Sequence, residues 1–441
     1  MSQSRTMHLA ADLSHIHTDY LWRAAGSWIG YPYLGPELYE ECARIAARGC
    51  MDLLFFGDSA NTSENHGGNH HAAVRYGMRW PKHDPMPFIP LMARAAQGVG
   101  FGLTMSTTYH HPFHVARLFN SLDHVTGGRI AWNAVTSAYK NEAQNWGFDE
   151  MMEHDERYVR ATEHMGVACK LWDSVEKDAI VFDKTTGVFA DPTKVHLINH
   201  RGKYFKVRGP LPVMPSPQGR PVLIQAGQSP AGIDLAATYA EMQFVSRNTL
   251  ASMKKHRAEL DARLAAHGRS PRDCGVLWSL RIQVGESDED AREKERRYIA
   301  SIPVEAGIIE MSHMYGIDFS ALPADMPVIE LAETIQRQNV HWGNFKEVLE
   351  TIDPATTIAQ LGRKNAIGKN HAILGTPKRI ADQLEEFHYE TGENGGFILA
   401  KGFEIPGYLR DFVEYVVPEL QRRGLSKTRY SGRTLRENLN G

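Results

Sequence analysis

Short apolar runs that alternate with helical patterns constrain the fold of this chain more than any other feature. Eight such runs read as buried strands, and strands that alternate with helices argue for a parallel sheet built from strand–helix units. Eight parallel strands are also the number that closes a (β/α)8 barrel, the TIM barrel. The expected strands lie near residues 7–12, 51–57, 99–106, 129–135, 221–226, 241–246, 276–284 and 396–401. The sequence therefore predicts an α/β fold of the TIM-barrel type.

Helical patterns fill the intervals between these runs, with apolar residues at a spacing of about 3.6. The expected helices cover residues 36–48, 112–124, 153–174, 249–267 and 406–424. Three intervals are longer than a plain barrel needs, and long loops on a barrel are usually lids or specificity elements. We expect a single barrel domain over residues 1–441, with insertions at about 59–84, 176–220 and 302–375. The first insertion is our candidate lid.

The composition excludes several classes of protein. The 441 residues are 42% hydrophobic and 23% charged, as is ordinary for a globular protein with a sizeable core. Lysine and arginine total 49 against 52 acidic residues, so the net charge of -3 gives no electrostatic case for nucleic acid. No apolar run reaches the roughly 20 residues of a membrane span, the N-terminus lacks the core of a signal peptide, and the four cysteines are too scattered for a disulfide framework. We expect a cytoplasmic protein without nucleic-acid or membrane partners.

Four of the expected strands end in polar groups. Asp58 follows the second strand, Thr104 lies near the end of the third, Asn133 lies near the end of the fourth, and residues 225–229 follow the fifth. Barrel enzymes place their chemistry at the carboxyl ends of the strands. Polar groups that four strands bring to one rim suit a polar heterocycle with a phosphate tail. This pattern indicates a flavin site.

Several longer segments match a known family pattern, in order and at matching spacing through nearly the whole chain. They cover residues 122–129, 132–137, 153–158, 217–222, 225–229, 375–382, 416–424 and 430–436. In these segments the sequence resembles the bacterial-luciferase-like flavin monooxygenases. Within them it is most similar to the branch of the nitrilotriacetate, EDTA and dibenzothiophene-sulfone monooxygenases.

The resemblance implies a two-component monooxygenase. Such an enzyme binds FMN in its reduced form, FMNH2, which a separate NAD(P)H:FMN reductase supplies. It uses O2 to oxygenate a small organic substrate through a flavin C4a-(hydro)peroxide, and we expect cleavage of a C–S or C–N bond to follow. Relatives suggest a homodimer or a homotetramer. By position, the flavin contacts of the family fall on Asp58, Thr104, Asn133, His154, Tyr158, Gly227 and Ser229.

The chemistry of these residues agrees with that placement. The side chains of Asn133 and Thr104 can hydrogen-bond the pyrimidine edge of a flavin, and the hydroxyls of Tyr158 and Ser229 can bind its phosphate. Ser229 stands before Pro230 at an expected helix start, where free backbone N–H groups favour an anion. The spacing of His154 and Tyr158 places them on one helical face. As acid–base groups the candidates are His15, His17 and His154.

Three other functions remain to be weighed. A metal-dependent hydrolase is suggested by His15 and His17, which imitate a ligand pair after the first strand. That chemistry needs further carboxylate, lysine or histidine ligands, so we expect no metal. The strand ends where they would stand carry Asn133, Gln225, Ser246 and Lys401. A deazaflavin-dependent dehydrogenase of the same superfamily is the closer alternative, and oxygen consumption separates it from a monooxygenase. A flavin-binding barrel without activity is the third.

Some positions look individual to this chain. Sulfone-cleaving relatives have a histidine two residues before a Gly-Ile-Asp stretch, where this chain has Met314, with His313 displaced by one position. The histidines of the candidate lid, at positions 66, 70, 71 and 83, are expected in a solvated loop. The basic tail of residues 427–436 is expected to face solvent or another subunit.

Overall fold

A closed parallel barrel forms the centre of the molecule. In this computed structural model, the described residues are 5–16, 21–24, 26–28, 30–32, 35–332, 349, 352–368, 370–400, 402 and 404–440. The sheet order is β10-β9-β4-β3-β2-β1-β13-β11, and a further pairing of β10 with β11 closes the ring. All of these pairings are parallel. The expected TIM barrel is confirmed.

Each of the eight expected strands is present within a few residues of its expected bounds. The barrel strands are β1 (His8–Asp12), β2 (Leu53–Phe56), β3 (Gly100–Ser106), β4 (Ile130–Val135), β9 (Val222–Gln225), β10 (Met242–Val245), β11 (Gly275–Val284) and β13 (Gly395–Leu399). Strands β2, β4 and β9 are buried along almost their whole length, as parallel strands covered by helices must be.

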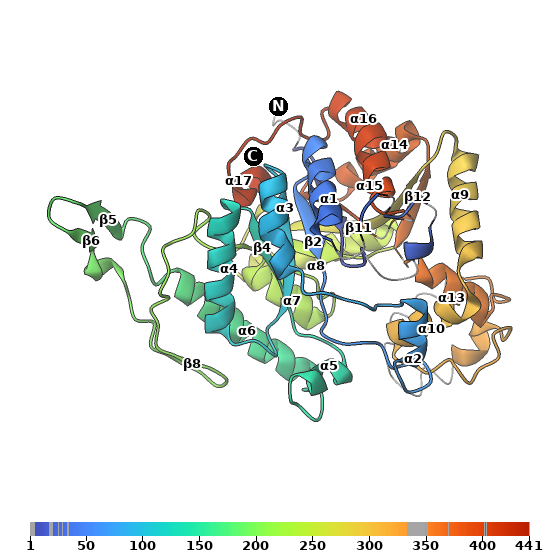
Figure 1. The fold of residues 1–441 in the computed structure, drawn as a ribbon, viewed down its shortest axis with the longest axis horizontal. Helices are drawn as coiled ribbons and strands as arrows, with labels where there is room; N and C mark the ends of the chain where they lie inside the picture. The colour runs from blue at the N-terminus through green and yellow to red at the C-terminus, as the bar shows by residue number, and fades with distance from the viewer. Residues whose placement is uncertain are drawn as a thin grey trace.

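Helices surround the barrel (Figure 1). They are α1 (Pro36–Arg48), α2 (His71–Tyr76), α3 (Ile89–Ala95), α4 (Pro112–Thr126), α5 (Lys140–Asn145), α6 (His154–Trp172), α7 (Pro230–Tyr239), α8 (Leu250–Ala266), α9 (Asp288–Ser301), α10 (Val304–Tyr315), α13 (Ile358–Ala366), α14 (Pro377–Glu390), α15 (Gly407–Asp411), α16 (Val417–Arg422) and α17 (Leu435–Asn440). Short 3-10 turns cover Leu21–Arg23, Met86–Phe88, Pro192–Lys194, Pro271–Asp273 and Val328–Leu331.

The last long helix differs from its expected form. The apolar pattern predicts one helix over residues 406–424, whereas the structure has α15, a π-helical turn over Phe412–Val416, and α16. Pro418 stands in the first turn of α16, where its nitrogen cannot donate the hydrogen bond that a continuous helix requires. The chain widens into a π turn just before this proline, which keeps the apolar face on the barrel.

The insertions contain more regular structure than a loop. Residues 59–84 include α2, and residues 176–220 form two hairpins, β5 (Ile180–Asp183) with β6 (Val188–Ala190) and β7 (His200–Arg201) with β8 (Lys206–Val207). The third insertion contributes α10, α13 and β12 (His371–Gly375). Strand β12 pairs in parallel with the second half of β11, outside the closed ring. It is a ninth strand that the periodicity of the sequence does not reveal.

The inside of the barrel is filled by side chains of alternate strand positions. Phe55 of β2 and Phe244 of β10 meet edge to face there, with ring centroids 4.2 Å apart. Leu435 of α17 joins this inner cluster, and its backbone N–H bonds the carbonyl of Gly128. The C-terminal helix therefore covers the amino end of the barrel. Figure 1 shows α17 on the opposite side of the molecule from α2, α10 and α13.

Candidate active site

The polar side chains that end β3 and β4 are brought together. Thr104 and Asn133 are register partners in the two neighbouring strands, and Asn133 Nδ2 donates to Thr104 Oγ1 at 2.8 Å. Asn133 Oδ1 is buried and has no hydrogen-bond partner among the residues that the structure describes. An unpaired buried oxygen costs stability unless something binds it. This atom is therefore a buried acceptor without a partner, and Asn133 itself lines neither of the two cavities described below.

The turn from β9 into α7 forms a second polar corner. Ser229 caps α7, and its Oγ accepts from the backbone N–H of Gly232 at 3.2 Å. A Cβ on Gly227 would stand 2.6 Å from the hydroxyl oxygen of Tyr158, so this hydroxyl lies directly against the turn and would have to shift for any larger residue there. The structure thus places Tyr158, Gly227 and Ser229 together at the N-terminus of α7, and their binding of a phosphate stays a prediction.

His154 lies beside this corner. It is the first residue of α6, its ring centroid is 5.1 Å from that of Tyr158, and its Nδ1 lies 2.7 Å from Asp155 Oδ1. Its side chain is half-exposed and faces a cavity that Tyr158 and Ser229 also line. The expected shared helical face is confirmed, and His154 reaches the same space as the proposed phosphate hydroxyls.

Two cavities open at the carboxyl end of the barrel. The larger has a volume of about 1170 Å³ and extends from α6 and the β9–α7 turn to β12 and α13. The smaller, of about 590 Å³, lies between the β2 and β3 ends, the 59–84 insertion and α5. Ser137 lines the larger and donates to Ser106, which lines the smaller, at 2.9 Å. The predicted flavin contacts are divided accordingly: His154, Tyr158 and Ser229 line the larger cavity, whereas Asp58 and Thr104 line the smaller.

The smaller cavity is lined by two acidic groups whose pKa burial raises. Burial raises the pKa of Asp58 above its usual range, and Lys82, at 3.7 Å, opposes that shift. Glu142 on α5 is 4% exposed, and burial raises its pKa as well. Its Oε1 accepts from the backbone N–H of Ala60 at 3.1 Å, while Oε2 is buried without a hydrogen-bond partner in the described part of the chain. Glu142 is thus a second acidic group in the candidate site, which the sequence does not single out.

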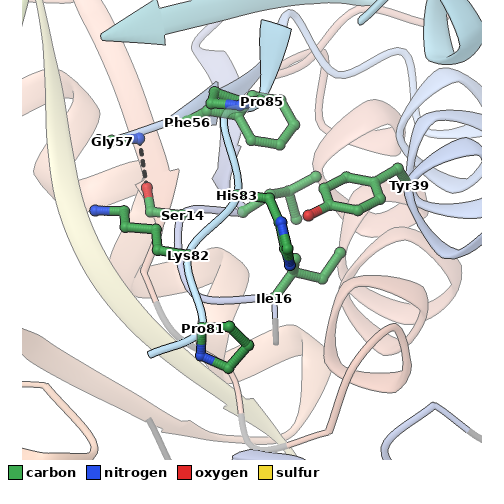
Figure 2. A pocket seen from close by; sticks show the side chains of 10 residues that line it. Ser14, Ile16, Tyr39, Phe56, Gly57, Pro81, Lys82, His83 and Pro85 are labelled. Carbon is green, nitrogen blue, oxygen red and sulfur yellow. Dashed lines mark hydrogen bonds between the residues drawn. The ribbon is translucent and has the colours of Figure 1, made fainter. Parts of the chain in front are cut away.

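The residues that follow β1 lie beside a third and much smaller cavity. Ser14 and Ile16, which flank His15, line a cavity of about 20 Å³, and Ser14 Oγ accepts from the backbone N–H of Gly57 at 2.5 Å (Figure 2). A space of this size holds about one water molecule. Tyr39 and His83 also point toward it in Figure 2, whereas His15 is not one of its lining residues. His17 lies outside the described residues.

A buried histidine links the insertions to the barrel. His313 on α10 is 4% exposed, with Nδ1 3.1 Å from Ser63 Oγ and Nε2 3.0 Å from Tyr139 OH. Burial raises the pKa of Tyr139. These contacts are made by His313 and not by Met314. The histidine that is displaced by one position in the sequence therefore lies buried between Ser63 and Tyr139.

Other histidines and the basic tail also have defined places in the fold. His111 caps α4 by accepting from the backbone N–H of Phe113. The prediction of a solvated loop is wrong for His66, which is buried and lies 3.1 Å from Glu305 of α10, because the insertion folds onto α10. For the basic tail the expectation holds for Arg429 and Arg433, which are exposed, and is wrong for two residues: Arg436 pairs with Glu241, and Lys427 pairs with the buried Asp52.

Two absences concern the described residues alone. Among residues 5–440, as far as the structure describes them, no group of three or more histidines, cysteines, aspartates or glutamates is placed to hold a metal ion. No helix in the same part of the chain is long and apolar enough to cross a membrane.

The fold is a TIM barrel with polar side chains gathered at the carboxyl ends of β3, β4 and β9. A family model described as luciferase-like monooxygenase matches residues 47–394. The chain therefore belongs to the luciferase-like monooxygenase family, and the resemblance seen in the sequence is confirmed.

Individual relatives match over almost their whole length. Dibenzothiophene-sulfone monooxygenase of Rhodococcus erythropolis (strain XP) is 37% identical, and the match covers 100% of this chain and 97% of the relative. Nitrilotriacetate monooxygenase component A of Aminobacter aminovorans is 38% identical, covering 94% of this chain and 93% of the relative. The chain is thus similar throughout to enzymes named as monooxygenases, which are oxidoreductases.

Solved structures agree with this assignment. The crystal structure of DmoA from Hyphomicrobium sulfonivorans superposes with a TM-score of 0.89 at 34% identity, covering 99% of this chain and 92% of that one. The structure of riboflavin lyase with a modified FMN and riboflavin superposes with a TM-score of 0.85 at 26% identity, covering 99% and 96%. The second structure shows that a protein with this fold holds a flavin.

Proposed function

We propose that this chain is the oxygenating component of a two-component monooxygenase. It binds reduced FMN, which a separate NAD(P)H:FMN reductase supplies, and uses O2 to oxygenate a small organic substrate, with cleavage of a C–S or C–N bond as the outcome. The observation that carries the proposal is the set of polar groups at the strand ends: the buried, unpaired acceptor Asn133 Oδ1 beside Thr104, together with the Ser229 corner at the start of α7. The name of one relative, component A, supports the two-component arrangement.

The residues present fit a reduced flavin. The N–H groups of its pyrimidine edge are donors, and the buried acceptor Asn133 Oδ1 is matched to a donor. Its phosphate is a dianion, and the corner offers Ser229, the hydroxyl of Tyr158 and the positive end of α7. When bound, the reduced flavin supplies the activation of O2, with the C4a-(hydro)peroxide that the family resemblance implies.

The residues of the chain bind the flavin, orient it and shield it from water. Asn133 and Thr104 fix the orientation of the ring edge, because their mutual hydrogen bond already holds both side chains in place. Asp58 and Glu142, whose pKa values burial raises, are placed to hold or move a proton at their carboxyl oxygens. His154, and His15 and His17 after β1, remain our proposed acid–base histidines. The 59–84 insertion, joined to α10 through His66 and His313, is the proposed cover that excludes water.

The proposal includes a homodimer or homotetramer. The β5–β6 hairpin exposes Val181, Phe182, Val188 and Phe189, with the two phenylalanine rings 5.0 Å apart. Exposed apolar groups of this kind usually mark a contact surface. We propose that this hairpin contributes to contacts between copies of the chain, and sedimentation of the purified protein tests the state of assembly.

Anaerobic titration with reduced FMN, followed by rapid mixing with oxygenated buffer, tests the function. We expect tight binding of the reduced flavin and an oxidised-flavin spectrum that returns far more slowly than for free reduced FMN. Reoxidation at the rate of the free flavin, or no binding, would overturn the proposal. A deazaflavin-dependent hydride transfer without oxygen consumption would then take its place.

A further inference from the structure

The two cavities at the carboxyl end of the barrel differ in charge. The smaller is mixed, because its lining includes three acids and two cations: Asp58, Asp84, Glu142, Arg79 and Lys82. The larger has only cations among its charged lining residues, as far as the chain is described: Arg157, Arg247, Arg281 and Lys364, with His154 and His371 beside them. A cleft lined by charge of one sign concentrates ligands of the opposite sign.

The three arginines among these cations have partners within the protein. Arg281 forms an ion pair with Glu295 of α9, and Arg157 donates to the carbonyl of Ser137. Arg247 donates to the side chain of Gln228, the residue before Ser229, and so belongs to the phosphate corner. A phosphate monoester carries about −1.5 to −2 charges at neutral pH, which the cations of that corner can balance.

Lys364 is different, because it comes from an element that contributes none of the proposed cofactor contacts. It is an exposed residue of α13 that lines the larger cavity, and no carboxylate within the described residues lies within ion-pair distance of it. The cavity, at about 1170 Å³, also exceeds the roughly 300–1,000 Å³ of an ordinary small-molecule site. There is thus room for a second ligand on the α13 side, next to a cation without an acidic partner.

The helix that presents Lys364 is held in place. A Cβ on Gly362 would stand 2.8 Å from the carbonyl carbon of Gly307, so α13 and α10 cross at direct backbone contact. Arg363 Nε donates to the carbonyl of Ile302 at 2.8 Å, and Thr357 and Gln360 form a capping box at the start of α13. The Lys364 backbone is therefore fixed relative to the cavity before any ligand binds.

We propose that the substrate is a small organic anion, with a carboxylate or sulfonate group that Lys364 binds on the α13 side of the larger cavity. This inference rests on the proposed function, since it names the class of molecule that is oxygenated there. An ammonium group and a carboxylate or sulfonate form a charge-assisted hydrogen bond, which is stronger than a neutral one. The rest of the substrate reaches from Lys364 toward the proposed flavin site.

Matched pairs of acids and methyl esters test this inference. The probes are (methylthio)acetate, (benzylthio)acetate and N,N-dimethylglycine, each beside its own methyl ester. Binding to the protein loaded with reduced FMN is measured without oxygen, from the change in flavin absorbance, and turnover is then measured by oxygen uptake and mass spectrometry. We expect at least one acid to bind about tenfold more tightly than its ester, with a preference that falls as salt is added.

Variants of Lys364 identify the residue responsible. We expect K364M to lose the preference for the acid by about tenfold, and K364R to keep most of it, while the affinity for reduced FMN stays as in the wild type. Lys255→Met is the matched control, because Lys255 is an exposed lysine of α8 that does not line the larger cavity. This control removes the same net charge and should leave the preference intact.

The outcomes separate the two proposals. If the protein binds reduced FMN but the esters bind as well as the acids, if neither kind of probe binds, or if K364M retains the preference, the anionic substrate is overturned and the monooxygenase stands. If the wild type does not bind reduced FMN, the proposed function fails first, and this inference fails with it.

Discussion

Asn133 is the residue on which the cofactor proposal depends most. We expect Asn133→Ala to weaken binding of reduced FMN by about 10- to 100-fold, because the ring edge loses a buried partner and Thr104 loses its donor. Anaerobic titration of the variant measures this. Asn120→Ala is the control: Asn120 is another buried asparagine with an unpaired Oδ1, but it lies on α4. Equal losses of affinity in the two variants would show that the effect is only one of stability.

Glu142 predicts a pH dependence with a definite sign. Burial raises its pKa, so the folded protein holds this proton more tightly than the unfolded chain. The stability that this protonated carboxyl provides is fully present below about pH 4.3, the pKa of the group in the unfolded chain. It is lost as the pH rises through the higher pKa of the group in the folded protein. Glu142→Gln cannot ionise, yet its Oε1 still accepts from Ala60. We expect the free energy of unfolding of the variant, relative to the wild type, to increase with pH across that window.

Chemical denaturation at several pH values measures this difference. Glu150→Gln serves as the control, because Glu150 is a largely exposed residue that pairs with Lys140 at the surface. Parallel pH profiles for the wild type and Glu142→Gln would contradict the assignment of a buried proton to Glu142.

Single residues were predictable where their position on a strand dictates their place. Thr104 and Asn133 could be paired from the sequence because carboxyl ends of neighbouring parallel strands meet at one rim. The positions of Glu142 and Lys364 beside the cavities could not be predicted from the sequence. A charged residue on a short helix is ordinarily solvated, and only tertiary packing turns it toward a cavity. His66 was misread for the same reason: a histidine in a polar loop gives no sign that α10 will cover it.

At the scale of elements, the β9–α7 turn is the most constrained. A Cβ on Gly232 would stand 2.7 Å from the carbonyl carbon of Gly227, so the strand and helix approach at backbone contact. We expect Gly232→Ala to destabilise the protein by about 1–3 kcal/mol and to weaken binding of reduced FMN, because the Ser229 corner must move. Gly407→Ala is the control, since a Cβ there meets nothing closer than 3.4 Å. Denaturation and titration of both variants check this; an unmoved affinity in Gly232→Ala would exclude the corner from the cofactor site.

Elements were predicted well where one apolar face repeats. The expected and observed bounds of α1 coincide at Pro36–Arg48, since a proline opens that helix and Gly49 follows it. The segment over 406–424 was read as one helix because periodicity does not register the missing N–H of Pro418. Strand β12 was hidden for another reason: five residues within a long insertion carry little pattern, and its pairing with β11 is long-range.

For the whole molecule, the alternation of strands and helices was enough to predict the barrel, because parallel strands need crossover helices and eight of them close. The insertions were not predictable in the same way. Their placement depends on contacts between segments far apart in the sequence, such as His66 with Glu305, His313 with Ser63, and Arg79 with Glu310. The catalytic scaffold is therefore readable from local patterns, whereas the parts that shape the cavities are not.

The β5–β6 hairpin lets assembly be separated from cofactor binding. It stands apart from the barrel in Figure 1, and Phe182 and Phe189 are 57% and 58% exposed. When a short Gly/Ser turn replaces Ile180–Ala190, we expect affinity for reduced FMN within about twofold of the wild type, because distant sites contribute independently. We also expect the variant to sediment as a smaller species, since a two-stranded hairpin with exposed apolar side chains is stable only when packed. Loss of flavin binding together with assembly would instead mean that neighbouring copies complete the site, and unchanged sedimentation would remove the hairpin from the interface.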